Sequence, residues 1–175
     1  VIIALDIGTT KVLCLVADYD DDDNLRIVGV GQESCDGLNK GVISEIATTV
    51  RSIRRAKDKA TAMSSFKVET ITTGIAGNHI QSYNGNSEIN ILNDEVTAED
   101  KEKVIDAACD IDIPGDQEVL HKIAQYFTID GQIGIKEPIG MAGKRLGVNV
   151  HLITCSSTAK KNLTKCIENS LLTVD

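Results

Sequence analysis

The first eleven residues constrain the fold of this chain most, because an apolar run ends there in a short polar turn. Val1 to Leu5 are apolar and partly β-branched, a composition typical of a strand buried on both faces. The polar residues that follow are a carboxylate, a glycine, two hydroxyls and a lysine: Asp6, Gly8, Thr9, Thr10 and Lys11. We therefore expect a strand that ends in a tight turn rich in groups able to bind phosphate.

Each residue type of this turn suits a magnesium-bound phosphate chain. Gly8 lets the backbone approach an anion, and the N–H groups of such a turn can form an anion-binding nest. Thr9 and Thr10 carry hydroxyl donors, and Lys11 carries a compact positive charge. Asp6 can hold a hydrated Mg²⁺ through its waters. The same residues also fit an ordinary hairpin turn, so both interpretations stay open at this point.

Length and charge narrow the classes of function. A chain of 175 residues fits one large domain or two small ones. Its net charge of −8, without a basic stripe interleaved with aromatics, argues against nucleic-acid binding. We expect no signal peptide, because Val1 begins a strand directly, and no apolar run approaches the ~20 residues that span a bilayer. Five cysteines without a C-x-x-C pair indicate buried, reduced thiols in a cytoplasmic protein.

The first part of the chain predicts three strands, a helix and a fourth strand. Strands are expected at 1–5, 11–17 and 25–30, and the acidic run 18–24 between two of them is typical of a solvated hairpin tip. Ser44 is the expected N-cap of a helix over 45–63, followed by a strand at 68–76. Three consecutive strands form a meander rather than a βαβ unit, which argues against a Rossmann fold.

A second domain is expected after Gly77. Its predicted order is strand, helix, strand, strand and helix, with Thr97 as a helix cap. One long strand is expected to carry five residues on one side at period two: Val119, His121, Ile123, Phe127 and Ile129. Residues 131–143 are predicted to form a long glycine-rich loop whose apolar residues need cover. His79, His121 and His151 have no clear carboxylate or nucleophile partner, so a structural role is expected for each.

Several segments along the chain carry a family resemblance. Residues 6–11 resemble the phosphate-1 loop of actin, Hsp70 and sugar kinases. The order and spacing of the later segments resemble the N-terminal part of FtsA, the family of bacterial actin-like cell-division proteins: 77–80, 94–97, 121–130, 134–141 and 150–155. The resemblance runs through nearly the whole chain and is most specific in 118–155.

This resemblance implies an α/β fold in two parts. Residues 1–77 would be part of an actin-like, ribonuclease H-like subdomain 1A (β-β-β-α-β), and residues 78–175 would be an SHS2-type subdomain 1C (β-α-β-β-α). It also implies that ATP and Mg²⁺ bind in a cleft of which this chain forms one wall. Asp6 would orient metal-bound water, and Gly8 to Lys11 would hold the phosphates. No catalytic residue is assigned, and the parent protein would be at most a weak ATPase.

The resemblance also implies partners. The parent would assemble into filaments, tether FtsZ to the cytoplasmic face of the inner membrane through a C-terminal helix outside this chain, and recruit later division proteins through subdomain 1C. Candidate partner-binding residues are Ile135, Ile139 and Met141. Two alternatives stay open: a sugar- or glycerol-kinase-like phosphotransferase, which opens with a similar loop, and a PilM-like pilus assembly scaffold, which has a similar layout.

Overall fold

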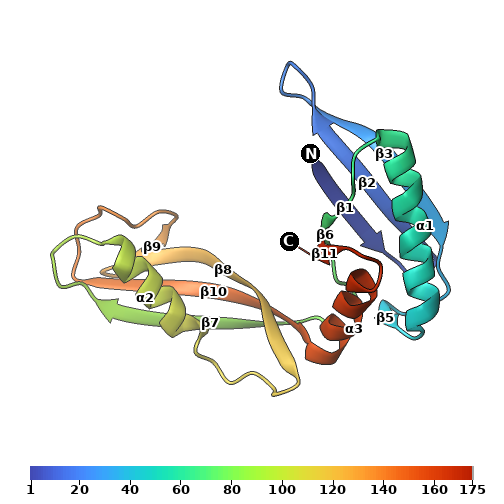
Figure 1. Cartoon of the computed structure of the whole chain (residues 1–175). Coiled ribbons are helices and arrows are strands. Elements are labelled where there is room, and N and C mark those ends of the chain that lie inside the picture. Colours follow the sequence, from blue (N-terminus) through green and yellow to red (C-terminus); the bar gives the residue numbers. More distant parts are fainter. Residues whose placement is uncertain (175) are drawn as a thin grey trace. The chain divides into compact units, whose positions relative to one another are not determined.

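The computed structural model describes residues 1–174 and divides them into two compact units (Figure 1). Unit 1 contains the segment Val1–His79 and, in addition, the chain from Ser157 onward, whereas unit 2 contains Ile80–Ser156. Both units combine helices with β-sheet, so the mixed α/β class predicted from the sequence is confirmed.

Unit 1 is built on a five-stranded sheet with the order β11-β6-β1-β2-β3. Strands β1 (Ile2–Ile7), β2 (Lys11–Tyr19) and β3 (Leu25–Ser34) form the predicted antiparallel meander, and β6 (Thr70–Thr73) runs parallel to β1. Helix α1 (Ile46–Ser64) and a small hairpin of β4 (Leu38–Asn39) and β5 (Val42–Ile43) lie between β3 and β6 in the sequence. The predicted order β-β-β-α-β is thus present, with this hairpin added.

Helix α1 packs on one face of that sheet because alternate residues of β2 turn toward it. Val12, Cys14 and Val16 are fully buried there. On β3 the helix approaches the strand backbone itself, since a Cβ at Gly31 would lie 1.8 Å from the carbonyl oxygen of Ala56. The N-cap of α1 is Glu45, without a side-chain hydrogen bond, so the cap predicted at Ser44 is wrong.

The last helix belongs to unit 1, which corrects the predicted boundary that assigned residues 78–175 to one domain. Helix α3 (Ser157–Glu168) places Cys166 and Ile167 in the core of unit 1, and β11 (Thr173–Val174) pairs with β6. Arg54 and Lys57 of α1 donate to the carbonyl oxygens of Asn169 and Ser170 just after α3. The return of the chain is therefore fixed by apolar packing, strand pairing and basic side chains together.

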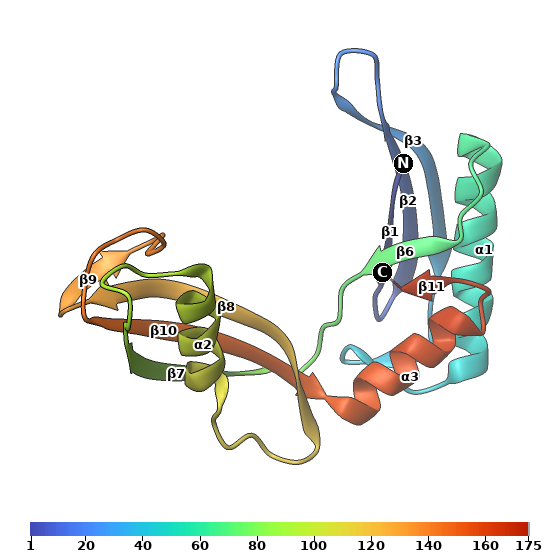
Figure 2. The same ribbon diagram turned by 60° about the vertical axis from the view of Figure 1, so that its left-hand side comes forward.

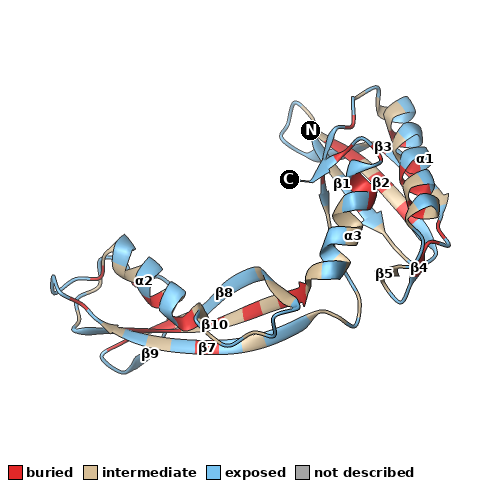
Figure 3. Cartoon of the chain, turned by 60° about the horizontal axis from the view of Figure 1, so that its bottom comes forward, coloured by how far each residue is buried: buried red, intermediate tan, exposed pale blue. Residues whose placement is uncertain are grey.

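Unit 2 is an antiparallel sheet of order β7-β10-β8-β9 with one helix on one face (Figure 3). Its elements are β7 (Gln81–Asn90), α2 (Ala98–Cys109), β8 (Gln117–Ile129), β9 (Gln132–Ile135) and β10 (Arg145–Ser156). Val104 and Ala108 of α2 join Phe127 and Val150 of the sheet in one apolar core. Strand β9 takes up part of the predicted 131–143 loop, so the order within this unit is β-α-β-β-β.

Two β-bulges interrupt β8, and the one at Gln125 puts the residues just before it and just after it on opposite faces. Asn149 pairs with Tyr126 while Val150 pairs with Ala124, which leaves Gln125 without an opposite residue. An extra residue shifts the two-residue alternation. Phe127 consequently lies in the core, whereas Ile123 is 45% exposed, so the prediction that both share one side with His121 is wrong.

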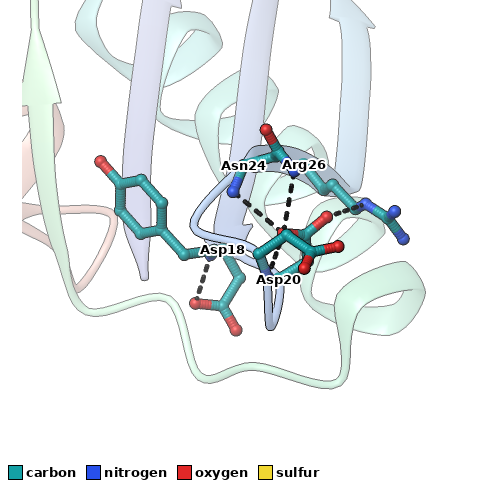
Figure 4. A network of polar contacts seen from close by, with 6 residues as sticks. Asp18, Asp20, Asn24 and Arg26 are labelled. Carbon is teal, nitrogen blue, oxygen red and sulfur yellow. Dashed lines mark hydrogen bonds and ion pairs between the residues drawn. The ribbon is translucent and has the colours of Figure 1, made fainter.

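The acidic run forms the tip of the β2–β3 hairpin (Figure 4). Oδ1 of Asp20 accepts the backbone N–H groups of Asp22 and Asn24 at 3.0 and 2.9 Å, and Oδ2 pairs with Nε of Arg26 at 2.7 Å. Asp20 therefore closes the turn. Among the described residues, no three His, Cys, Asp or Glu side chains come together in a way that could hold a metal ion.

Candidate functional site

The turn between β1 and β2 is held on both sides by backbone hydrogen bonds. The N–H of Gly8 donates to the carbonyl oxygen of Lys11 at 2.9 Å, and the carbonyl oxygen of Thr10 accepts the N–H of Cys35 at 3.0 Å. The first bond closes the turn on itself, and the second ties it to the residue after β3. The turn is therefore closed by one bond and anchored to the end of β3 by the other.

The same turn presents several polar groups to solvent. Thr9, Thr10 and Lys11 are exposed. Over residues 1–174, the backbone N–H groups and hydroxyls of Thr9 and Thr10 make no hydrogen bond, and neither does the ammonium of Lys11. Gly8 differs from the expected nest, because its N–H is already bonded to Lys11. The donors available to an anion therefore come from Thr9, Thr10 and Lys11.

Asp6 and Lys11 project from the same face of the sheet. Asp6 pairs with Leu13, and Lys11 lies two residues before Leu13 on β2, so strand alternation puts all three on one side. The opposite side carries Leu5 and Val12, which belong to the core under α1. No ion pair joins Asp6 to Lys11 in the part of the chain that the structure describes, which leaves both charges available to a ligand.

The carboxyl ends of β1 and β6 meet at the edge of the sheet that carries this turn. The strands are parallel, with Leu5 opposite Thr73, and the Thr73 hydroxyl donates to the Leu5 carbonyl oxygen at 2.7 Å. After Thr73 the chain leaves the sheet through residues 74–77. In open α/β sheets ligands bind outside the carboxyl ends of parallel strands. Thr73 was not predicted as a site residue, because the sequence shows there only a hydroxyl residue at the end of an expected strand, without a recognisable motif.

His79 lines a small cavity of about 10 Å³ next to this edge. The lining includes Ile7 at the end of β1, Ile43 of the β4–β5 hairpin and Leu163 of α3. Both ring nitrogens are buried without a hydrogen-bond partner. Nothing in this lining provides a carboxylate or nucleophile, so the arrangement fits the structural role predicted for His79.

The other two histidines lie on the sheet of unit 2. His151 and Asn84 are joined across β10 and β7 by a 2.7 Å contact between Nδ1 and Oδ1. His121 is exposed on β8. These positions give His151 an amide partner and leave His121 on a solvent-facing strand.

Two larger hollows of unit 1 lie away from the 8–11 turn. One of about 300 Å³ is lined by Val1, Ile2 and Thr72 among others, and one of about 520 Å³ by Glu69, Leu171 and Thr173 among others. Neither contains a residue of the turn. Thr9, Thr10 and Lys11 are exposed at the surface of unit 1.

The three candidate partner-binding residues of unit 2 separate into core and surface. Ile135 is 8% exposed and belongs to the core of the unit, and Met141 is half-buried and packs against that core. Ile139 is 46% exposed. The segment that carries it is fixed to the start of α2, because Gly140 donates to Val96 and Val96 donates to Met141, each at 2.9 Å. Ile139 is thus an apolar side chain held outward on an ordered segment.

The described helices do not include a membrane span. None of those within residues 1–174 combines the length and the apolar character needed to cross a bilayer.

Comparison with known proteins agrees with the resemblance seen in the sequence. Residues 77–154 match the family model for the SHS2 domain inserted in FtsA. Proteins named cell division protein FtsA match nearly the whole chain, with 47% identity in Neisseria meningitidis over 98% of this chain, 45% in Pseudomonas aeruginosa over 99%, and 36% in Escherichia coli K12 over 99%. The chain spans about two fifths of the length of these relatives, 41, 42 and 41% respectively.

One solved structure supports the fold. A chain of a PilM-PilN type IV pilus biogenesis complex superposes with a TM-score of 0.62 over 99% of this chain and 45% of that chain, at 11% sequence identity. At this identity the likeness concerns the architecture alone. The three sequence relatives named above, by contrast, carry the FtsA name.

Proposed function

Because this chain belongs to the FtsA family of cell division proteins, we propose that it supplies one wall of an ATP–Mg²⁺ site and an adjoining protein-interaction domain. The wall is the β1–β2 turn of unit 1 with Asp6 beside it. The interaction domain is unit 2, which contains nearly all of the matched SHS2 domain.

The phosphate assignment is supported most by the unbonded donors of the turn. Thr9 and Thr10 offer backbone N–H groups and hydroxyls that no protein atom uses among the described residues, and Lys11 adds a positive charge. Polar groups exposed in this number on an anchored turn suit the oxygens of a phosphate chain. In an ordinary hairpin turn these donors would be hydrated and the identity of the residues would matter little.

Asp6 takes the metal side of the proposed site. Its carboxylate lies on the same sheet face as Lys11 without forming an ion pair with it, so it is free to hold the waters of a hydrated Mg²⁺. When bound, the ion neutralises part of the phosphate charge. Gly8 contributes by shape, since its missing side chain keeps the turn narrow, and a Cβ there would lie 3.2 Å from the Lys11 carbonyl oxygen.

For unit 2 we propose a role in self-association and in recruiting later division proteins. Ile139 supports it, because an exposed isoleucine on a hydrogen-bonded segment costs little to order when a partner covers it. We further propose that the whole protein tethers FtsZ to the cytoplasmic face of the inner membrane. The FtsZ contact and the membrane helix would lie outside the residues of this chain.

Calorimetric titration of the full-length protein with ATP and Mg²⁺ tests the nucleotide site. Lys11→Ala should raise the Kd for ATP by about tenfold or more, because a charge-assisted contact is lost. Lys67→Ala is the matched control, since Lys67 precedes β6, at the end of that strand away from the turn, and pairs with Glu69. Equal affinity in the Lys11 variant and the unchanged protein would remove Lys11 from the site.

A further inference from the structure

A second lysine, Lys40, occupies an unusual turn in unit 1. Strands β4 and β5 are joined by the two residues Lys40 and Gly41, with φ values of 49° and 82°. Hairpins with two residues in this left-handed region strongly favour Asn-Gly or Gly-Gly, because a side chain is disfavoured there. Lys40 therefore occupies a backbone conformation that asparagine or glycine adopts more easily. Residues held in such disfavoured conformations cluster at functional positions.

This turn is pressed against the segment that follows β6. A Cβ at Gly41 would lie 2.5 Å from the carbonyl oxygen of Ala76, and a Cβ at Gly77 would lie 3.4 Å from the carbonyl oxygen of Lys40. Gly41 and Ala76 also share the lining of the His79 cavity with Ile7, the last residue of β1. The Lys40–Gly41 turn is thereby fixed at the edge of the sheet where the phosphate-binding turn begins.

The arrangement of the ribbon agrees with these contacts. The hairpin of β4 and β5 lies at the same end of the unit 1 sheet as the β1–β2 turn (Figure 2). Leu38 of β4 is 6% exposed in the core, and Ile43 of β5 packs against that core, so the hairpin is held firmly. The position of Lys40 is therefore set by the fold.

The ammonium of Lys40 has no counter-ion in the described chain. Lys40 is exposed and forms neither a hydrogen bond nor an ion pair within residues 1–174. Two other lysines of unit 1 differ in this respect, since Lys59 pairs with Glu33 and Lys67 with Glu69. Two unpaired lysines, Lys11 and Lys40, thus lie at one edge of the sheet.

We propose that Lys40 is a second phosphate-binding residue of the same nucleotide site. This rests on the function proposed above, which places the phosphate chain at the β1–β2 turn. A nucleoside triphosphate carries more negative charge than one lysine and one Mg²⁺ neutralise, and a second ammonium at this edge offsets the remainder. Gly41 acts with it as a positioning residue, because its close contact with Ala76 fixes how near the Lys40–Gly41 turn lies to the segment after β6.

The test measures binding of ATP, ADP and adenosine to the full-length protein, with Mg²⁺ present. Lys40→Gly removes the charge and at the same time suits the left-handed turn, so its unfolding midpoint should be unchanged or raised. We expect its Kd for ATP to rise about tenfold or more, a smaller rise for ADP and none for adenosine. Lys40→Arg should restore most of the ATP affinity, and Lys67→Ala should leave all three affinities unchanged.

The outcomes separate this inference from the function on which it rests. If Lys11→Ala weakens ATP binding and Lys40→Gly does not, Lys40 lies outside the site while the proposed nucleotide function stands. An equal loss for ATP and adenosine would mean that Lys40 acts through structure and not through phosphate, which overturns the inference. If neither variant changes ATP affinity, the nucleotide site itself is wrongly placed and both proposals fall.

Discussion

Thr73 donates its side-chain hydroxyl to the carbonyl oxygen of Leu5, with 2.7 Å between the two oxygens. The register of β1 and β6 ends with this pair of residues, because the chain turns away from the sheet after Thr73. The hydrogen bond from the Thr73 side chain thus joins β6 to β1 at the last pair of the backbone register. It fixes β1 one residue before Asp6.

Replacing Thr73 tests how much this bond stabilises unit 1. Thr73→Val keeps the shape but removes the donor, and we expect a loss of about 1 kcal/mol in the free energy of unfolding. Thr73→Ser keeps the hydroxyl and should lose less. Urea unfolding followed by circular dichroism provides the comparison. A loss in the serine variant with none in the valine variant would show that the methyl group matters and the hydrogen bond does not.

Gly31→Ala should destabilise unit 1 strongly. The added Cβ would meet the backbone of Ala56 at 1.8 Å, so α1 must move off β3, at a cost of about 1–3 kcal/mol or more. Gly74→Ala is the matched control, because a Cβ there meets nothing within 4 Å. Thermal unfolding of both variants should show a lower midpoint for the Gly31 variant alone.

Thr97 caps helix α2 through a reciprocal pair of bonds. Its hydroxyl accepts the N–H of Asp100 at 3.1 Å, and Asp100 accepts the N–H of Thr97 at 3.0 Å. Thr97→Ala removes the first of these bonds. We expect the free energy of unfolding, measured with urea, to fall by about 1 kcal/mol. Thr97→Ser retains both bonds and is the control. A loss of the same size in the serine variant would contradict the cap.

The same cap predicts an acid dependence of stability. Hydrogen bonds from Thr97 lower the pKa of Asp100 below the ordinary value of 3.8. The charged form is favoured in the folded state, so the stabilisation is present above pH 3.8 and is lost as pH falls through the lower folded pKa. Asp100→Asn should therefore reduce the stability difference between neutral pH and the acid region. If stability depended on pH in the same way in the Asp100→Asn variant, Asp100 would not contribute to acid unfolding.

Thiol alkylation should single out Cys109. Burial raises the pKa of Cys14 to about 11 and raises that of Cys166, and both side chains are fully buried. Burial also raises the pKa of Cys109, but this residue is only half-buried on α2. Mass spectrometry after brief iodoacetamide treatment under mildly alkaline conditions should find Cys109 modified first. Modification of Cys14 or Cys166 at the same rate would mean that unit 1 opens readily.

Ile139→Asp tests the proposed contact surface of unit 2. Because Ile139 is exposed, the substitution should weaken self-association in analytical ultracentrifugation while leaving the unfolding midpoint unchanged. Ile135→Asp is the contrasting variant, since that side chain lies in the core and a charge there should unfold unit 2. A fall in the midpoint of the Ile139 variant would instead mark Ile139 as part of the core.

Local sequence signals predicted the elements that depend on local interactions. The β1–β2–β3 meander, helix α1 and the Thr97 cap all follow from alternation, helical spacing and capping chemistry over a few residues. The bulge at Gln125 had no such signal, because any residue can be the extra one and its effect appears only when Asn149 and Val150 pair across the sheet. The return of α3 to unit 1 was missed for the same kind of reason, since an apolar helix face does not say which core it enters.

The candidate site shows the same division. The residues of the turn were predicted because they are contiguous, and their identity carries the chemistry. The use of the Gly8 N–H by Lys11 was not predicted, since it depends on the tightness of the turn. Lys40 was missed because its position depends on the contact between Gly41 and Ala76, which are distant in the sequence.

The chain leaves unit 1 at His79 and comes back at Ser157, so unit 2 is an insertion between two parts of one folded body. During synthesis the ribosome must complete residues 80–156 before α3 and β11 exist to finish the first core. The core of unit 1 is therefore completed last, although β1, β2 and β3 are synthesised first. An inserted unit that folds quickly keeps the two parts of unit 1 close to each other, because Gln81 and Thr154 near its two ends are paired.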